Sequence, residues 1–248
     1  MQNQCRDSFY TTFPTYPSML DYHEVQARNS QWKHTQVRNL EVEPLDAKSP
    51  YFGNTAAFAG GISEEAVKDT AENLGLAIRI DGELYPVRST AYKSLLDRAK
   101  IGGTALPKLD RGVLAQTLNA CLKLFGSDAL TLIRDEKVAA VHSGDAVDYS
   151  VLPIDALLRA LQSNLDARFP ENEFEQGYSD HFISSATWKL PKQKEDLLGA
   201  YAKLLASQGK TKIADKLMPG IRFITSDTGV ASAKVSALLL GFQCPIHI

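Results

Sequence analysis

Apolar residues recur at helical spacing in several segments of the chain between residues 63 and 208. The clearest stripe consists of leucines between Pro153 and Pro170, and proline is typical of the first turn of a helix and of the positions after its end. Ser63 and Asp110 can cap two further helices, and Gly209 suits the C-terminal end of another. The pattern predicts helices over residues 63–75, 90–99, 110–125, 153–169 and 191–208.

Short segments between these helices have the alternation or the turn residues of β-strands. Asp81-Gly82 favours a type I′ turn between strands at 76–80 and 83–88. Further strands are predicted at 36–43, 129–134, 137–142, 182–190 and 221–225, and residues 229–242 form either a helix or a strand. Because strands come as hairpins with helices between them, we predict an α+β fold, a largely antiparallel sheet with helices packed on it.

Residues 1–60 lack a sustained period of either kind and are rich in aromatic residues. We therefore predict two parts, an N-terminal aromatic and polar segment at 1–60 and a single α+β core domain at 61–248. The first part is either a strap packed on the core or an arm that binds a partner, since Tyr and Trp are favoured at interface hot spots. Its candidate partner-binding residues are Phe9, Tyr10, Phe13, Tyr16 and Trp32.

Composition is that of an ordinary globular protein, with 44% hydrophobic and 23% charged residues. A net charge of −2 argues against a dedicated binder of duplex DNA, whose affinity comes from clustered Lys and Arg. The start of the chain lacks the apolar core of a secretory signal, and no segment is long enough to span a bilayer. These features predict a cytoplasmic protein that does not contact a membrane.

Motifs for phosphate, dinucleotide or metal chemistry are not found in the sequence. Gly209-Lys210-Thr211 contains part of a phosphate-loop motif, but Leu204 occupies the position of the required earlier glycine. GxGxxG, GxSxG and HExxH do not occur, the five histidines are scattered, and the three cysteines include no CxxC pair. We therefore expect no cofactor, no disulfide framework and no metal site.

Polar residues gather at the ends of predicted strands, where sites grafted on a scaffold usually lie. If these ends converge, a histidine could act as a general base that an aspartate orients, which would make the protein a hydrolase. The alternative is that the same residues are helix caps and turn residues. The candidate catalytic residues are His142, Asp180, His181 and Asp227.

The segment from Lys189 to Lys216 contains seven lysines against three acidic residues, in a chain that is otherwise acidic. With an aromatic residue at its edge, this segment could bind single-stranded nucleic acid by stacking and by charge. The alternative is a solvated helix face. The candidate nucleic-acid-binding residues are Trp188, Lys189, Lys192, Lys194, Lys210 and Lys212.

Residues 84–240 include the phrases LYPVRSTAYKSLLDRAKIGG, LNACLKLF, KVAAVHSGDAVDYSVLPIDALL, LDARFPENEFEQGYSDHFISSATWKLP and PGIRFITSDTGVASAK. These segments resemble sequences of phage- and plasmid-borne bacterial proteins of unknown function, the domain-of-unknown-function group numbered 932. The resemblance implies an origin in a mobile element. It includes no catalytic motif, so it assigns no functional residue.

Three functions follow, in order of preference. The first is a non-enzymatic accessory protein of a phage or plasmid that binds a host protein, such as a defence component, or a nucleoprotein complex. The second is a protein that binds or anneals single-stranded nucleic acid through the lysine-rich segment. The third is a hydrolase built on the histidine and aspartate candidates.

Overall fold

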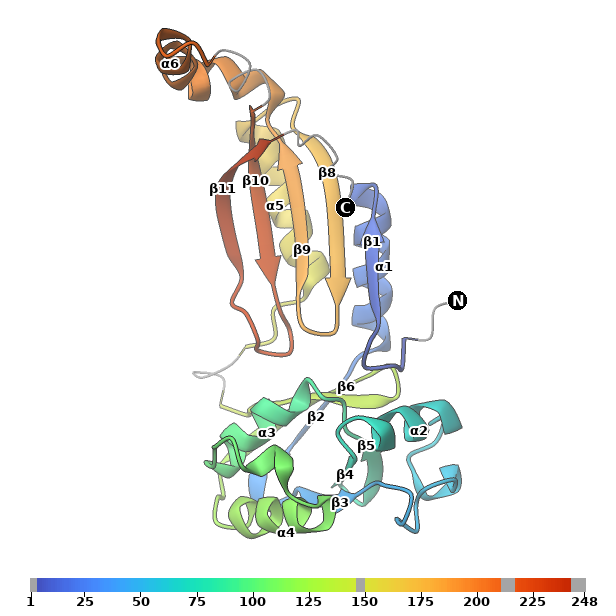
Figure 1. Cartoon of the computed structure of the whole chain (residues 1–248). Coiled ribbons are helices and arrows are strands. Elements are labelled where there is room, and N and C mark those ends of the chain that lie inside the picture. Colours follow the sequence, from blue (N-terminus) through green and yellow to red (C-terminus); the bar gives the residue numbers. More distant parts are fainter. Residues whose placement is uncertain (1–3, 146–149, 211–216, 242–248) are drawn as a thin grey trace.

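A computed structural model describes residues 4–145, 150–210 and 217–241 and shows two halves stacked end to end (Figure 1). One half is built on a five-stranded sheet and the other on two three-stranded sheets. The smaller half consists of the contiguous residues 31–143, which are inserted between two helices of the larger half. The α+β class predicted from the sequence is confirmed, and the paired strands within each sheet are antiparallel.

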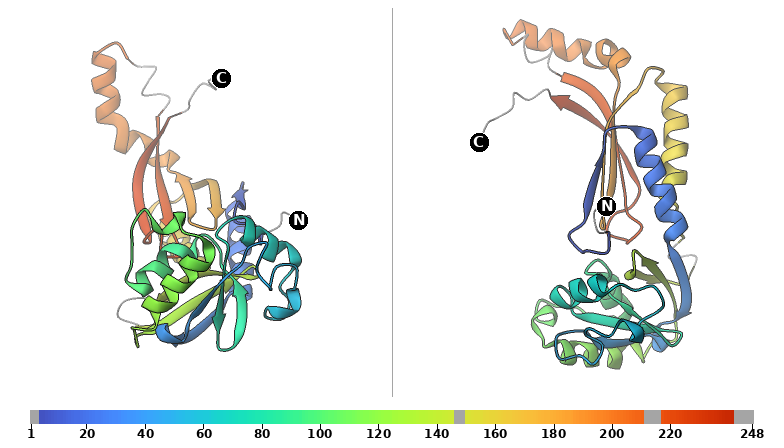
Figure 2. Two further views of the ribbon diagram at one scale, coloured as in Figure 1. Left: turned by 60° about the horizontal axis from the view of Figure 1, so that its bottom comes forward. Right: turned by 90° about the vertical axis from the view of Figure 1, so that its right-hand side faces the viewer.

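The five-stranded sheet has the order β1-β8-β9-β10-β11. Its strands are β1 (Tyr10–Phe13), β8 (Glu173–Asp180), β9 (Ser184–Lys189), β10 (Leu217–Thr225) and β11 (Lys234–Gly241). Helices α1 (Tyr16–Asn29) and α5 (Ile154–Arg168) pack side by side on one face, and no other described helix covers the opposite face (Figure 2). Met19, Leu158, Trp188 and Phe223 fill the core between the sheet and these helices.

The smaller half pairs β2 (Gln31–Gln36) with β6 (Asp128–Arg134) and β7 (Lys137–Ser143) in one sheet. The other sheet contains β3 (Glu41–Pro44), β4 (Leu76–Ile80) and β5 (Glu83–Pro86). An isolated bridge between Val87 and Val138 connects the two sheets. Helices α2 (Glu64–Glu72), α3 (Ala91–Ala99) and α4 (Arg111–Leu122) cover them, and most of this half has one continuous apolar core.

Local signals in the sequence set several of the observed element boundaries. The Ser63 side chain accepts from the Ala66 N–H and the Asp110 side chain from the Gly112 N–H, so both predicted caps are confirmed. Asp81 and Gly82 have φ values of 51° and 84°, as a type I′ turn requires. The predicted helix at 191–208 is a short 3₁₀ turn, Pro191–Gln193, followed by α6 (Lys194–Ser207), and residues 234–241 form a strand. No helix in the described ranges combines the length and the apolar content needed to cross a membrane.

The strand pairing does not support a division at residue 60. Strands β1, β2 and β3 pair with β8, β6 and β4, and α1 packs on α5, so residues 1–60 contribute to all three sheets. The elements missing from the sequence prediction are β1, α1, β2 and β8. The predicted strand at 36–43 is instead a 3₁₀ turn, Val37–Asn39, followed by β3. Residue 242, the last residue of the segment predicted as helix or strand, lies outside the described residues.

Candidate functional site

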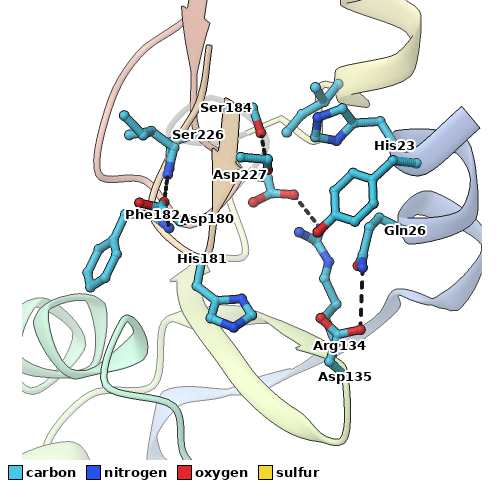
Figure 3. A pocket seen from close by; sticks show the side chains of 14 residues that line it. His23, Gln26, Arg134, Asp135, Asp180, His181, Phe182, Ser184, Ser226 and Asp227 are labelled. Carbon is cyan, nitrogen blue, oxygen red and sulfur yellow. Dashed lines mark hydrogen bonds and ion pairs between the residues drawn. The ribbon is translucent and has the colours of Figure 1, made fainter. Parts of the chain in front are cut away.

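Polar side chains from distant segments meet where the two halves touch (Figure 3). Two cations at this place are almost completely buried, with side-chain exposures of 1% for Arg88 and 0% for Lys137. Arg88 follows β5 and Lys137 begins β7, so the smaller half supplies both. We call the group of these cations and their partners the junction cluster, which consists of Asp7, Asp69, Arg88, Asp135, Lys137 and His181.

His181 is held in a single tautomer by two neighbours. Arg88 Nη1 lies 2.6 Å from His181 Nδ1, and a guanidinium can only donate, so Nδ1 accepts this hydrogen bond. Nε2 therefore carries the ring proton and donates to the main-chain oxygen of Arg6 at 2.8 Å. Burial, together with the Arg88 charge, lowers the pKa of His181 to about 3, so the ring is neutral.

Lys137 fixes the N-terminal segment to the smaller half. Its Nζ lies 3.0 Å from Asp7 Oδ1 and 2.5 Å from Asp69 Oδ2. Asp7 also accepts from the main-chain N–H of Ser89 at 2.9 Å. Burial on its own would raise the pKa of Asp7, but Lys137 and the Ser89 hydrogen bonds outweigh it, and the pKa lies below its ordinary value. Asp7 is therefore a carboxylate at neutral pH.

A second ion pair, Arg134 with Asp227, lies beside the junction cluster. Arg134 Nη2 donates to the Asp227 carboxylate, and Nε donates to Ser30 Oγ at 2.8 Å. His142 Nε2 lies 2.8 Å from the main-chain oxygen of Asp227 and donates to it. The structure thus brings His142 and Asp227 together, but the histidine contacts the backbone oxygen while the carboxylate pairs with Arg134.

Asp180 closes the turn between β8 and β9. Its Oδ1 accepts from the main-chain N–H groups of Phe182 and Ile183, and its Oδ2 accepts from the Tyr178 hydroxyl. The four predicted catalytic residues therefore have separate hydrogen-bond partners. Asp180 is thus a turn residue, as the alternative interpretation of the sequence predicted. The other three candidates are instead held by arginine side chains or backbone oxygens, which neither interpretation predicted.

The predicted nucleic-acid-binding residues do not form a stacking platform. Trp188 is completely buried in the core and its Nε1 donates to Gln162, so the prediction that it stacks on bases is wrong. Lys189 pairs with Glu175 and Lys192 pairs with Glu171 on the surface. Lys194 begins α6, Lys210 is exposed, and Lys212 lies outside the described residues.

The predicted partner-binding aromatics are mostly packed inside the molecule. Phe9 contacts the His181 ring at a centroid distance of 5.4 Å, and Phe13 belongs to the sheet core. Tyr16 packs near Trp188, and Trp32 lies 6.0 Å from the His142 ring. Only Tyr10 of the five is strongly exposed, at 58%. The strap interpretation therefore describes these side chains better than the arm.

A cavity of about 270 Å³ opens beside the Arg134–Asp227 ion pair. We call it the side cavity. Its lining includes both apolar and polar residues. His23 Nε2 and Gln26 Oε1 are buried and have no hydrogen-bond partner among the described residues. The lining residues are His23, Gln26, Ala27, Ser30, Trp32, Arg134, Val151, Leu152, Pro153, Ile154 and Asp227.

Sequence reasoning missed His23, Gln26 and Arg134. His23 and Gln26 are three positions apart, which places them on one face of a helix, but the helix that contains them was not predicted. Within the described ranges, no group of three His, Cys, Asp or Glu side chains is arranged to hold a metal ion.

Comparison with protein-family models, curated proteins and solved structures gives no match to this chain. The protein is thus described by its structure alone, as an α+β protein in which residues 31–143 are inserted into the larger half and buried polar side chains lie between the two halves.

Proposed function

We propose that this protein acts by binding a protein partner, as an accessory protein of a phage or plasmid. Its origin in a mobile element is inferred from the sequence resemblance alone. Binding is favoured over hydrolysis because the His and Asp candidates have structural partners. The observation that carries the proposal is the outer edge of the five-stranded sheet, formed by β11.

Strand β11 lacks the features that normally protect a sheet edge. It pairs with β10 in a continuous register from Lys234 to Gly241, without a bulge. Natural edge strands are usually short, bulged, or interrupted by charge or proline, whereas β11 is charged only at Lys234 and reads KVSALLLG. Its other edge is unpaired among the described residues (Figure 1).

The side chains of β11 indicate what kind of segment would fit there. Val235 and Leu239 are exposed by 56% and 53%. In the β10–β11 register Val235 is opposite Phe223, a core residue on the helix-covered side, so Val235 and Leu239 extend that apolar face beyond the helices. We therefore propose that the partner supplies an extended segment with apolar residues at every second position, which adds a sixth strand.

The test is affinity purification from bacterial lysate, with chemical cross-linking, using the full chain as bait. The variant Val235→Lys/Leu239→Lys places charges on the exposed edge, and Val113→Lys, at another exposed apolar position on α4, is the matched control. We expect a partner that is retained by the wild type and by the control, is lost by the edge variant, and is cross-linked to residues 234–241. Thermal unfolding checks that all three proteins are folded.

Two results would overturn the proposal. One is an identical set of captured proteins for all three baits. The other is self-association of the purified wild type that the edge variant abolishes, with no other partner, since β11 would then pair with a second copy of the chain.

A further inference from the structure

The face of the five-stranded sheet opposite α1 and α5 is polar, and we call it the open face. No described helix lies over its middle, and α6 contacts the sheet at the end far from the smaller half (Figures 1 and 2). Phe13, Trp188 and Phe223 point to the helices, so their neighbours along each strand point to the open face. Six of these neighbours are Thr12, Tyr178, Ser185, Thr187, Arg222 and Ser236.

Two tyrosines stack on each other at one side of the open face. Tyr10 in β1 and Tyr178 in β8 have ring centroids 6.2 Å apart and ring planes at 21° to each other. The Tyr178 hydroxyl donates to Asp180 Oδ2 at 2.7 Å, which fixes this ring and gives Tyr10 a rigid neighbour. Tyr10 itself is 58% exposed. The pair therefore presents an aromatic stacking surface to solvent.

Two cations lie beside this aromatic pair on the same face. Arg222 Nε donates to Ser185 Oγ at 3.3 Å, and Ser185 is directly opposite Tyr178 in the β8–β9 register, so the guanidinium reaches over β9 towards the rings. Lys234 is diagonal to Arg222 across the β10–β11 pair, about 7–8 Å away. Both residues are exposed, and neither has a carboxylate partner among the described residues.

The described carboxylates of the open face lie towards its two ends. Asp180, at the end near the smaller half, accepts from two main-chain N–H groups of the turn that follows it. Towards the other end, Glu173 is opposite Lys189 in the register and Glu175 pairs with the same lysine. The middle of the face therefore combines two uncompensated cations with two aromatic rings. A polyanion that also carries flat rings complements both features.

We propose that the open face binds single-stranded nucleic acid. Unpaired bases stack on aromatic side chains of a sheet surface, and neighbouring Arg and Lys side chains bind the phosphates. Strands β8 and β10 are two strand spacings apart, about 10 Å, so a base on the tyrosine pair has its phosphate within reach of Arg222. Val235 and Leu239 belong to the opposite face, so the proposal does not depend on the protein partner at the edge of β11.

The test measures fluorescence polarisation of labelled oligonucleotides titrated with the full chain. The probes are a single strand of DNA and a single strand of RNA, both of mixed sequence and about 16 nucleotides long, and a DNA duplex of the same length. We expect at least one single strand to bind, and to bind more tightly than the duplex because paired bases cannot stack on a side chain. Its affinity should fall as the salt concentration rises.

The variant Tyr10→Ala tests the stacking surface. It removes the exposed ring and should weaken binding of the single strand by about 5- to 150-fold, the loss expected for one stacked base. The matched control is Phe52→Ala, which removes an aromatic ring that is 41% exposed in the smaller half and should leave the affinity unchanged.

The variant Arg222→Gln tests the phosphate contact. It should weaken binding and reduce the slope of log K against log salt concentration by about 0.7, the contribution of one phosphate contact to binding of a single strand. The matched control is Arg38→Gln, which removes an exposed arginine that also donates to a neutral side chain, Gln36, and should leave the slope unchanged. Thermal unfolding checks that all four variants are folded.

The proposal is overturned if neither single strand binds at about 50 mM salt, or if the duplex binds as tightly as the single strands. It is also overturned if Tyr10→Ala or Arg222→Gln behaves as its matched control does, because the nucleic acid would then be held elsewhere on the molecule. None of these outcomes affects the capture of a protein partner by β11, since the variant that tests it changes residues of the opposite face.

Discussion

At the scale of single residues, the junction cluster shows how the chain buries two cations. Lys137 lies between Asp7 and Asp69, and Arg88 lies between Asp7, Asp135 and His181. Buried charges of this kind contribute little net stability as pairs, but removing one member leaves its partners uncompensated. The cluster is therefore sensitive to single substitutions.

Replacing Lys137 with methionine should destabilise the protein strongly. The substitution leaves the carboxylates of Asp7 and Asp69 without their buried cation, and we expect a loss of about 3–5 kcal/mol in the free energy of unfolding. The control is Lys33→Met, which removes a partly exposed partner of Glu83 and should cost about 1 kcal/mol or less. Urea denaturation at neutral pH measures both, and similar losses in the two variants would contradict the prediction.

The neutral buried histidines should make stability fall in mild acid. The pKa values of His181 and His23 are about 3 and about 4 in the folded protein, both lowered chiefly by burial, against an ordinary value of 6.5. Below pH 6.5 the unfolded chain therefore binds protons that the folded chain does not, and stability decreases as the pH falls towards the folded values. Each histidine contributes about 1.4 kcal/mol per pH unit in this window.

A variant isolates the contribution of His181. Between about pH 7.5 and about pH 5, His181→Gln should lose about 2 kcal/mol less stability than the wild type, because its amide does not titrate. Burial raises the pKa of Asp135, which acts in the opposite direction but is present in both proteins. If both proteins lose the same unfolding free energy over this pH range, the pKa of His181 in the folded protein is not lowered and the prediction is wrong.

The members of the junction cluster could not be paired from the sequence. Asp7, Asp69 and Lys137 come from three separate segments. The folding of the smaller half brings Asp69 to Lys137, and the packing of the two halves adds Asp7. His181 was singled out from the sequence for its position at a strand end, and the structure does place it at the junction. Its neutral, doubly bonded ring depends on Arg88 and the Arg6 carbonyl, which no local pattern reveals.

At the scale of elements, the backbones of β10 and β9 lie so close at Gly220 that a side chain there would clash. An added Cβ on Gly220 would lie 2.6 Å from the main-chain oxygen of Trp188, which cannot move away without disturbing β9. We therefore expect Gly220→Ala to destabilise the protein by about 1–3 kcal/mol. Gly199 in α6 has no atom within 4 Å of such a Cβ, so Gly199→Ala should stabilise the protein by up to about 1 kcal/mol. Thermal unfolding measures the stability of the two variants against that of the wild type. A Gly220→Ala variant as stable as the wild type would contradict the predicted clash with the Trp188 main-chain oxygen.

Helices with an apolar face were predicted well and α1 was missed. The buried positions of α1 are Met19, His23 and Gln26, so two of its three inward residues are polar and no apolar period appears. A signal was nevertheless present, since Thr15 caps the helix and a proline follows in the first turn. Strand β8 was missed for a related reason, because its sequence EFEQGYSD is largely polar.

At the scale of the whole molecule, the junction cluster should make the two halves unfold together. Trp32 in β2 and Trp188 in β9 report on different halves, so single-tryptophan variants can follow each half separately. We expect coincident urea midpoints in the otherwise wild-type chain and separate midpoints after Asp7→Ala, which removes a shared partner of Lys137 and Arg88. Coincident midpoints in the Asp7→Ala chain would show that other contacts couple the halves.

The insertion of residues 31–143 between α1 and α5 also bears on how the chain forms during synthesis. All strands of the smaller half are complete once residue 143 has left the ribosome, whereas β1 pairs with β8, whose first residue is Glu173. At roughly 5–20 residues per second, β1 and α1 wait on the order of ten seconds or longer for their partners. The larger half must then close around a finished smaller half, with Asp7 reaching a lysine that is already in position. Strand β1 and helix α1 are therefore translated before the smaller half and reach their final contacts after it.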